Sequence, residues 1–395
     1  MLASKSIRFS IFDLYLGVIF AFPIVTMLAD GTIFNRLLFV LLFGLHLVSF
    51  FLHPISRKTL LCLLLFILHY IFVFFVTDFP LESSNLLIYF PFFLLYTHFV
   101  CDNWEKILIW FQRKKGFVIS IIAIWCTLVG VSIFLPSSYY IKEGGSRYFG
   151  SFCGSIFRLG PTVMFVQILI IMAQVLYGQK KAVALMVIPL YCVLMGSSRT
   201  YLIIGFCLFI ISWYIACTSK KVFWGTLIPV AALFVLLVTV SSMGDKIQFT
   251  LDENRYGDLW FRITSSRSEF WVELYQAWEK TPGSLKVFGN GIHFSFSIID
   301  AWAHNDFLEL LCTFGLLGLF EYVYAMGRLF KRAYGYIRVS TMVKICAFVV
   351  WFFNAFLNMH YVYVCSMLSF PFLLLALRCY FKENRVNKWN LSNGR

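Results

Sequence analysis

A histidine lies directly ahead of a long apolar run in the C-terminal third of the chain. The run is preceded by Ala303-His304-Asn305-Asp306 and has Glu309 in its first turn. The imidazole of His304 could accept a proton from a hydroxyl at neutral pH, or it could donate a hydrogen bond to a phosphate. Asp306 and Glu309 are expected to cap a helix, and either carboxylate could hold His304 in place. The alternative is an ordinary histidine at a membrane interface.

An arginine begins a segment with the periodicity of a helix. Ser266 and Glu269 have the spacing of a capping box, which places Arg267 in the first helical turn. Backbone amides and a guanidinium together make a good phosphate site, although an arginine that faces water is the alternative. Since aromatic and apolar residues follow at helical spacing, this amphipathic helix is expected to lie on the outer membrane surface. The apolar face consists of Phe270, Trp271, Leu274, Tyr275 and Trp278.

Two further arginines stand between apolar runs. Arg199 follows Gly196-Ser197-Ser198 where two expected spans meet, and a charge there is costly unless it is paired or binds an anion. Arg147 lies between Gly144-Gly145 and Gly150, and flexible backbone around a cation suits close approach to a ligand. A plain turn is the alternative at Arg147. The sequence shows no metal-ligand spacing and no nucleotide-binding loop, so neither a metal nor a cofactor is expected.

The composition indicates the class of structure that holds these candidate residues in place. Of the 395 residues, 60% are hydrophobic and only 13% are charged, and the mean hydropathy is +0.81. This composition excludes a soluble enzyme, a disordered chain and a secreted disulfide scaffold. It predicts an all-α polytopic membrane protein with about twelve transmembrane helices. The expected spans are 11–29, 34–52, 59–77, 84–101, 117–135, 161–178, 182–198, 200–217, 222–241, 306–327, 343–359 and 361–379.

The distribution of basic residues along the sequence predicts how the chain is oriented in the membrane. A net charge of +14 would suggest nucleic acid for a soluble protein, but basic residues also flank membrane spans on the cytoplasmic side, so no nucleic-acid partner is expected. With both termini in the cytoplasm, most Lys and Arg residues fall in inner loops. Most of the others gather in two outer loops, 136–160 and 242–305, which suggests an anionic ligand there. We expect a single integral membrane domain, 1–395, in which the larger loop carries the amphipathic helix.

These elements together resemble the bacterial O-antigen polymerase and O-antigen ligase superfamily. The strongest match is His304-Asn305, followed nine residues later by Gly315-Leu316-Leu317-Gly318. Arg267 with Trp271 resembles an Arg-x-x-x-aromatic element that precedes this motif in the family. The resemblance covers residues 140–325 in motif and the whole chain in topology.

The remaining arginines match the family in the expected order. Arg199 resembles the basic residue that follows an upstream span, and Arg147 with Gly150 resembles an Arg-x-x-Gly element of the preceding periplasmic loop. The resemblance implies a metal-independent glycosyltransferase of the membrane-embedded C-type fold, in the bacterial inner membrane. It also implies a glycan donor on undecaprenyl pyrophosphate, used at the periplasmic face.

The resemblance assigns roles to the candidate residues. Arg147, Arg199 and Arg267 would bind pyrophosphate, and guanidinium groups can stabilise charge on the departing phosphate. Arg199 and Arg267 therefore join His304 as catalytic candidates. His304 would act as the base towards a sugar hydroxyl, with phosphate binding as the rival role. The supporting residues would be Asn305, Glu309 and Trp271.

Several functions share this donor chemistry. A polymerase moves the growing glycan onto the non-reducing-end sugar hydroxyl of a lipid-linked repeat unit, whereas a ligase moves it onto lipid A–core. Polymerase is favoured because the Phe-rich chain and its Asn-Asp-Phe-Leu-Glu-Leu-Leu stretch resemble polymerases more closely. A flippase would also bind lipid pyrophosphate, but the sequence lacks clearly related halves. A structural protein would not explain the arginines. Membrane lipid is an expected partner, and a chain-length regulator is left open.

Overall fold

The apolar runs of the sequence fold into helices. The computed structural model describes residues 10–29, 33–76, 86–141, 147–252, 257–335 and 337–393. Within these ranges, nine helices are long and apolar enough to cross a membrane, which makes the chain a multi-pass helical membrane protein by length and composition. The nine are α1 (Ile11–Ala29), α2 (Ile33–Leu52), α3 (Arg57–Val76), α6 (Lys115–Ile133), α7 (Ile156–Tyr177), α9 (Arg199–Ala216), α10 (Lys220–Thr239), α16 (Asp306–Tyr334) and α18 (Val364–Asn393).

Three of the predicted spans form shorter helices. α4 (Leu86–Asp102) and α17 (Thr341–Leu357) are apolar but fall below the length of the nine. The run 182–198 divides into a 3₁₀ segment at Lys180–Met186 and the short helix α8 (Val187–Gly196). The all-α membrane architecture is therefore confirmed, and the total of twelve spans stays a prediction.

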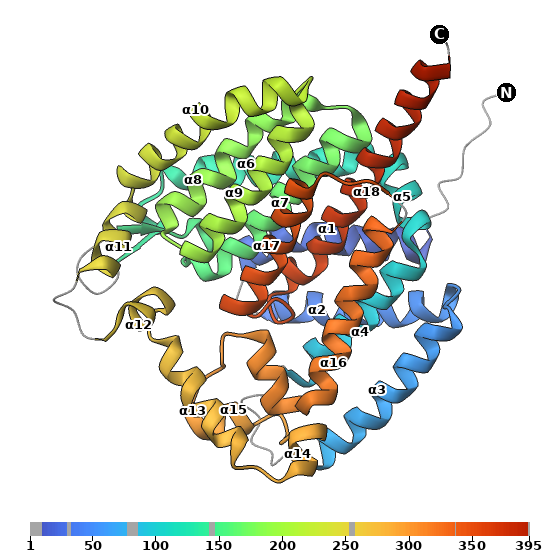
Figure 1. Cartoon of the computed structure of the whole chain (residues 1–395), viewed down its shortest axis with the longest axis vertical. Coiled ribbons are helices and arrows are strands. Elements are labelled where there is room, and N and C mark those ends of the chain that lie inside the picture. The colour runs from blue at the N-terminus through green and yellow to red at the C-terminus, as the bar shows by residue number, and fades with distance from the viewer. Residues whose placement is uncertain are drawn as a thin grey trace.

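Helix α7 forms the centre of the molecule. Most of its side chains are buried, and it packs against α1, α9 and α18. Helix α10 crosses the periphery in Figure 1, where it buries Phe223 and exposes most of its apolar side chains. Exposed apolar faces of this kind are stable when lipid tails surround them.

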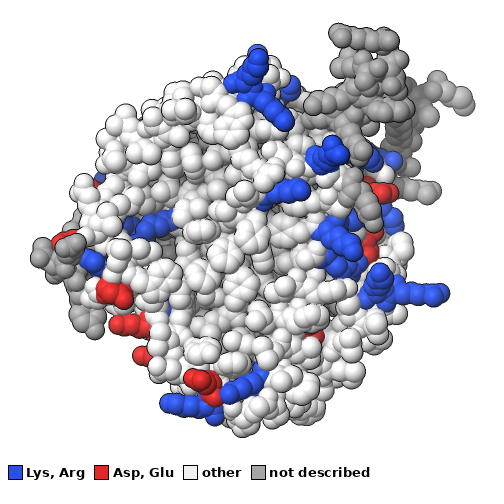
Figure 2. Space-filling view, viewed as in Figure 1, with Lys and Arg blue, Asp and Glu red and all other residues white. Residues whose placement is uncertain are grey.

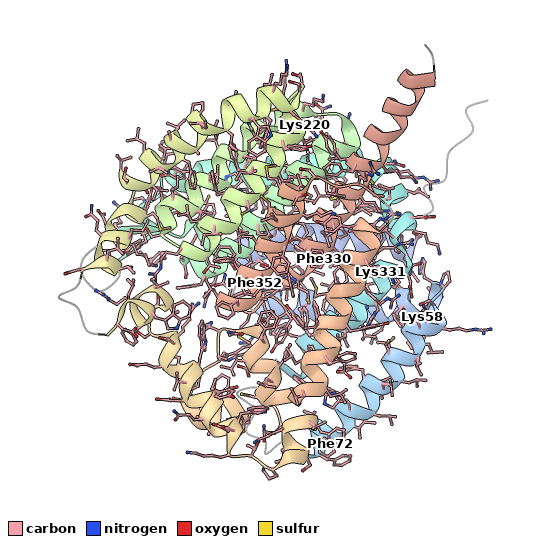
Figure 3. The ribbon with its side chains drawn as sticks, in the orientation of Figure 1. Lys58, Phe72, Lys220, Phe330, Lys331 and Phe352 are labelled. Atoms are coloured by element: carbon pink, nitrogen blue, oxygen red, sulfur yellow. The ribbon has the colours of Figure 1, made fainter. Side chains whose placement is uncertain are left out.

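Charge is distributed unevenly between opposite sides of the molecule. In Figure 3, Lys220 lies at the top of the molecule, Lys58 at its right-hand edge, and Lys331 between the centre and that edge. Acidic side chains gather mainly at the lower left of the face in Figure 2. The predicted outer loop 242–305 lies on that lower side and consists largely of short helices (Figure 1). These are α11 (Ser242–Leu251), α12 (Leu259–Thr264), α13 (Arg267–Glu279), α14 (Gly283–Phe288) and α15 (Phe294–Ile299).

Helix α13 forms where the sequence predicted it, but its N-terminus differs from the prediction. Ser266 has a left-handed backbone with φ of 69° and does not cap the helix with its side chain, so the capping box is wrong. Leu274 is fully buried with Ala303 and Cys312, and Trp278 packs against this group. Part of the apolar face of α13 therefore packs against α15 and α16, whereas Tyr275 on that face is 49% exposed. The place of this helix at the outer membrane surface stays a prediction.

The smaller loop, 136–160, contains a short antiparallel hairpin. Strands β1 (Tyr139–Ile141) and β2 (Arg147–Phe149) pair with Tyr140 opposite Tyr148. A 3₁₀ turn at Ser151–Cys153 leads into α7. The hairpin connects α6 to α7. Its strand β2 contacts α8, which places the hairpin near the point where α8 ends and α9 begins.

Helix α16 is interrupted at Gly315, which has φ of 67° and ψ of −170°. The segment after α14 enters this break, where Asn290 and Gly291 donate backbone hydrogen bonds to the carbonyls of Cys312 and Thr313, both at 3.2 Å. A side chain at position 315 would place its Cβ 2.4 Å from the Val287 carbonyl oxygen. The glycine therefore permits close approach of an extended segment and fixes the first turns of α16 against α14.

Replacing this glycine is expected to destabilise the fold. Gly315→Ala would combine left-handed backbone strain with a clash against α14, at a cost of about 2 kcal/mol or more. Thermal unfolding of the purified protein in detergent should show a lower midpoint for this variant. Gly327→Ala is the matched control in the same helix, because no atom lies within 4 Å of its added Cβ. Equal midpoints for the two variants would contradict the account of the break.

Candidate functional site

Arg199 begins α9 and extends towards the short helices α11 and α12. Ser198 caps α9 with its side chain, which fixes the point where the arginine leaves the helix. The Nη1 atom of Arg199 donates to the hydroxyl of Thr250 and to the carbonyl of Arg262, both at 3.0 Å. The Nη2 atom donates to the hydroxyl of Ser265. All of these partners are neutral, so none of them balances the positive charge.

Arg267 begins α13 directly after a tight turn. Ser265 and Ser266 both have left-handed backbones, with φ of 56° and 69°, and this turn directs Arg267 back towards the body of the protein. Its Nη1 atom donates to the carbonyl of Leu357, the last residue of α17. Burial lowers the pKa of Arg267, and the electrostatic influence of Tyr201 and Tyr363 opposes that shift. The side chain is half-buried and, like Arg199, its hydrogen-bonded partner is neutral.

The two guanidinium groups lie near enough to repel each other. No Asp or Glu among the described residues forms an ion pair with Arg199 or Arg267. Two like charges that are partly withdrawn from water and not neutralised favour binding of an anion. An oxyanion with several acceptor atoms, such as phosphate or pyrophosphate, matches the many donors of two guanidinium groups.

His304 lies beside Arg267, in the segment that leads into α16. Its pKa is lowered to about 4, chiefly by burial and then by the charge of Arg267, while a hydrogen bond to the backbone of Asn358 opposes the shift. The imidazole is therefore neutral at pH 7. We call Arg199, Arg267 and His304 the arginine–histidine cluster. The sequence predicted these three residues as a site, and the structure places Arg267 within electrostatic reach of both Arg199 and His304.

The three supporting residues position the backbone around His304. Trp271 donates from its indole N–H to the carbonyl of Ala303 at 2.7 Å, and Glu309 accepts from the backbone N–H of Ala303 at 2.8 Å. Asn305 caps α16 by accepting two backbone N–H groups at 3.0 and 3.2 Å. The predicted capping role of Asp306 and Glu309 is therefore wrong. The buried carboxylate of Glu309 also accepts hydroxyl hydrogen bonds from Ser295 and Thr313.

The turn between α17 and α18 completes the cluster. The sequence analysis placed a junction between two expected spans here, at 359–361, but did not assign it to the site. Leu357 and Asn358 present their backbones to the guanidinium of Arg267 and the imidazole of His304. Asp306 holds the other side of the turn by accepting the backbone N–H of His360 at 3.0 Å. The ring of His360 also contacts the amide of Asn354 at 2.9 Å. Polar residues at 354, 358 and 360 interrupt an otherwise apolar stretch, and that pattern could have indicated that the turn contributes to the site.

Arg147 lies apart from this cluster in the contacts that the described residues make. It is exposed on β2, and its guanidinium lies over the ring of Tyr139 at 4.4 Å. Gly150 has a structural role, since an added Cβ would lie 2.5 Å from the backbone nitrogen of Ser155. Gly144-Gly145, proposed to give Arg147 a flexible setting, fall outside the described residues. The described contacts of Arg147 thus lie within the hairpin, and its predicted role in binding pyrophosphate stays a prediction.

Comparison with known proteins does not assign the chain to a family. No protein-family model matches the sequence. No curated protein matches it significantly either. The functional argument therefore depends on the residues and on their geometry.

The proximity of Arg267 to His304 can be measured through the imidazole. We expect the pKa of His304 to be about 4 in the wild type and to rise in Arg267→Gln, while staying below 6.5 because burial remains. Hydrogen–deuterium exchange at the imidazole C2 position, followed by mass spectrometry across pH, reports this value. Lys280→Gln removes an equal charge from the other end of α13 and should leave it unchanged. A wild-type value near 6.5 would contradict the described surroundings of His304.

Proposed function

We propose that the chain is a membrane glycosyltransferase that uses a glycan on undecaprenyl pyrophosphate, and that it acts as an O-antigen polymerase. The observation that carries this proposal is the arginine–histidine cluster, in which Arg267 acts electrostatically on both Arg199 and the neutral imidazole of His304, and neither arginine has a described carboxylate partner. The cationic groups suit a pyrophosphate, and the imidazole suits a hydroxyl acceptor. The active site would face the periplasm, with both termini in the cytoplasm of a bacterial cell.

The imidazole of His304 is suited to the role of a base. Its hydrogen bond to the backbone of Asn358 uses one ring nitrogen as a donor, which leaves the other nitrogen as an acceptor in the neutral ring. A sugar hydroxyl of the acceptor repeat unit would transfer its proton to that nitrogen as its oxygen attacks the anomeric carbon. Binding of a pyrophosphate nearby would raise the pKa of the imidazole and increase its basicity.

Arg199 and Arg267 are suited to the leaving group. As the glycosidic bond to the pyrophosphate breaks, its electron pair moves to the phosphate oxygen, where negative charge increases. Guanidinium groups already fixed by Thr250, Ser265 and Leu357 stabilise this charge with little reorganisation. Neutralisation of the arginine pair by the substrate would also remove their mutual repulsion.

Polymerase and ligase share all of these steps and differ in the acceptor. The donor chemistry of the cluster fits both, and the polymerase assignment depends on the sequence resemblance around residues 304–318. Complementation separates them. The experiment uses a strain that lacks this chain, restores the wild type or a variant, and reads the O-polysaccharide as a ladder on a gel.

We expect the strain without the chain to carry lipid A–core capped with a single repeat unit, and the wild type to restore the ladder. Absence of even the single cap, with long chains accumulating on the lipid carrier, would instead identify a ligase. Lipid-linked repeat units retained on the cytoplasmic side would identify a flippase and contradict the glycosyltransferase proposal.

Variants of the cluster test the assigned roles in the same strain. His304→Ala and Arg267→Gln should each lower glycan transfer in membranes by about 100-fold or more, as expected for loss of a general base or of an oxyanion-stabilising donor. His293→Ala is the matched histidine control, because its ring stacks on Phe296 in the same segment. Each variant is compared at equal membrane expression. Full activity of His304→Ala would overturn the assignment of the base.

A further inference from the structure

A pocket of about 620 Å³ lies where helix α5 (Trp104–Arg113) meets the start of α1 and the end of α2. A space of this volume is typical of a ligand site. Helix α5 lies at the upper right of the molecule in Figure 1. Since none of the three residues of the arginine–histidine cluster lines the pocket, it is separate from the candidate active site.

Helix α5 has one side that packs against the protein and another that faces the pocket. Its buried side chains are Trp104, Ile107, Trp110 and Phe111. Lys106, Ile109 and Arg113 line the pocket, and their spacing of three and seven residues places them along one side of the helix. An amphipathic helix with basic side chains of this kind suits the interface between membrane and water.

The pocket carries positive charge that the described residues do not neutralise. Lys106 and Arg113 are exposed, and no Asp or Glu in the described part of the chain forms an ion pair with either of them. Asp13 is the one acidic side chain in the described lining. The first nine residues lie outside the described ranges, and their charged side chains, Lys5 and Arg8, are also basic. An anion is therefore the complementary ligand.

The pocket also offers hydrogen-bond acceptors. Asp13 accepts the backbone N–H of Ser10 through its Oδ2 atom at 3.2 Å, and its Oδ1 atom has no partner among the described residues. The Nδ1 atom of His53 lies 2.7 Å from the carbonyl oxygen of Ser49, which can only accept, so Nδ1 carries the proton. In the neutral ring, Nε2 is then an acceptor. Because Asp13 and His53 both line the pocket, they are suited to hydroxyl groups of the ligand.

Apolar side chains at the pocket favour a lipid over a free anion. Leu52 and Ile109 line the pocket and are 62% and 45% exposed. Ile11, which also lines it, begins α1, and Leu52 ends α2; both helices are candidate membrane spans. The ends of spans are where lipid headgroups meet lipid tails. Acyl chains would cover these apolar side chains, whereas a free phosphate would leave them uncovered.

From these observations we propose that the pocket binds an anionic glycerophospholipid whose headgroup carries hydroxyls, as that of phosphatidylglycerol does. The phosphate contacts Lys106 and Arg113, and the glycerol hydroxyls donate to Asp13 and His53. The acyl chains lie against the exposed apolar side chains of the lining.

The bound lipid joins α5 to the ends of α1 and α2. In the predicted orientation, α5 follows the fourth expected span and lies on the same side as the N-terminus, so the lipid belongs to the cytoplasmic leaflet, where anionic lipids interact with basic segments. The site is independent of the proposed transferase function.

Native mass spectrometry of the full-length, delipidated protein in detergent tests the site. Titration with single lipids gives the Kd of the first bound lipid. We expect phosphatidylcholine, which has no net charge, to bind more weakly than phosphatidylglycerol. Lys106→Gln combined with Arg113→Gln should weaken binding of phosphatidylglycerol by about 10-fold or more, because two charge-assisted contacts are lost. Lys220→Gln combined with Lys221→Gln removes two exposed charges at the start of α10 and should leave binding unchanged.

The hydroxyl contacts are tested with phosphatidylethanol, which has the charge of phosphatidylglycerol but no headgroup hydroxyls. We expect it to bind about 3- to 10-fold more weakly, as for the loss of one or two neutral hydrogen bonds. His53→Phe should reduce this difference between the two lipids. Equal binding of both lipids to the wild type would overturn the assignment of the headgroup.

Three further outcomes would contradict the proposal. Unchanged binding in the variant that lacks Lys106 and Arg113 would overturn the site itself. Displacement of phosphatidylglycerol by glycerol phosphate at an equal concentration would overturn the lipid assignment and indicate a site for a free anion. Equal or tighter binding of undecaprenyl phosphate would overturn the glycerophospholipid assignment. Because these experiments measure binding alone, their results are independent of the complementation experiment.

Discussion

Repulsion between two guanidinium groups is the constraint around which the candidate site is built. Arg199 on α9 and Arg267 on α13 are both half-buried and act electrostatically on each other, and their described hydrogen-bonded partners are hydroxyls and backbone carbonyls. Such partners satisfy the N–H groups but do not neutralise the charge, so the free energy of the unliganded site is raised. An anion between the arginines would remove this cost, which couples the electrostatics of the fold directly to ligand binding.

Two described acidic groups beside the site, Asp306 and Glu309, bind backbone N–H groups and form no ion pair with the arginines. Asp306 holds the turn between α17 and α18 through the backbone of His360, and Glu309 holds Ala303. Buried carboxylates that accept several hydrogen bonds fix their donors in position. Because both carboxylates belong to the first turns of α16, the break at Gly315 and the packing of α14 also determine where His304 lies. The positive charge of the site is thus kept by the same arrangement that positions its candidate base.

Sequence reasoning predicted the helices well because apolar length alone determines which segments can span a bilayer. It also selected Arg267 and His304, because charged and titratable side chains are rare beside apolar runs and therefore indicate candidate sites. It could not predict their contact with Leu357, which depends on a turn between two other helices. The Ser-x-x-Glu pattern at 266–269 was misleading because a tight left-handed turn, required to direct Arg267 inwards, replaced the cap. The sequence also did not predict that the guanidinium of Arg147 would lie over the ring of Tyr139, because that contact depends on the pairing of β1 with β2.

The most direct test of the account measures stability with and without undecaprenyl pyrophosphate. If the arginine pair exists to bind the anion, Arg199→Gln and Arg267→Gln should melt at the same temperature as the wild type or higher when no ligand is present. Only the wild type should then gain stability from the ligand, by about 2.7 kcal/mol at a concentration one hundred times its Kd. Variants that melt lower without ligand, and still gain the full stabilisation with it, would show that the two arginines serve the fold and not the ligand.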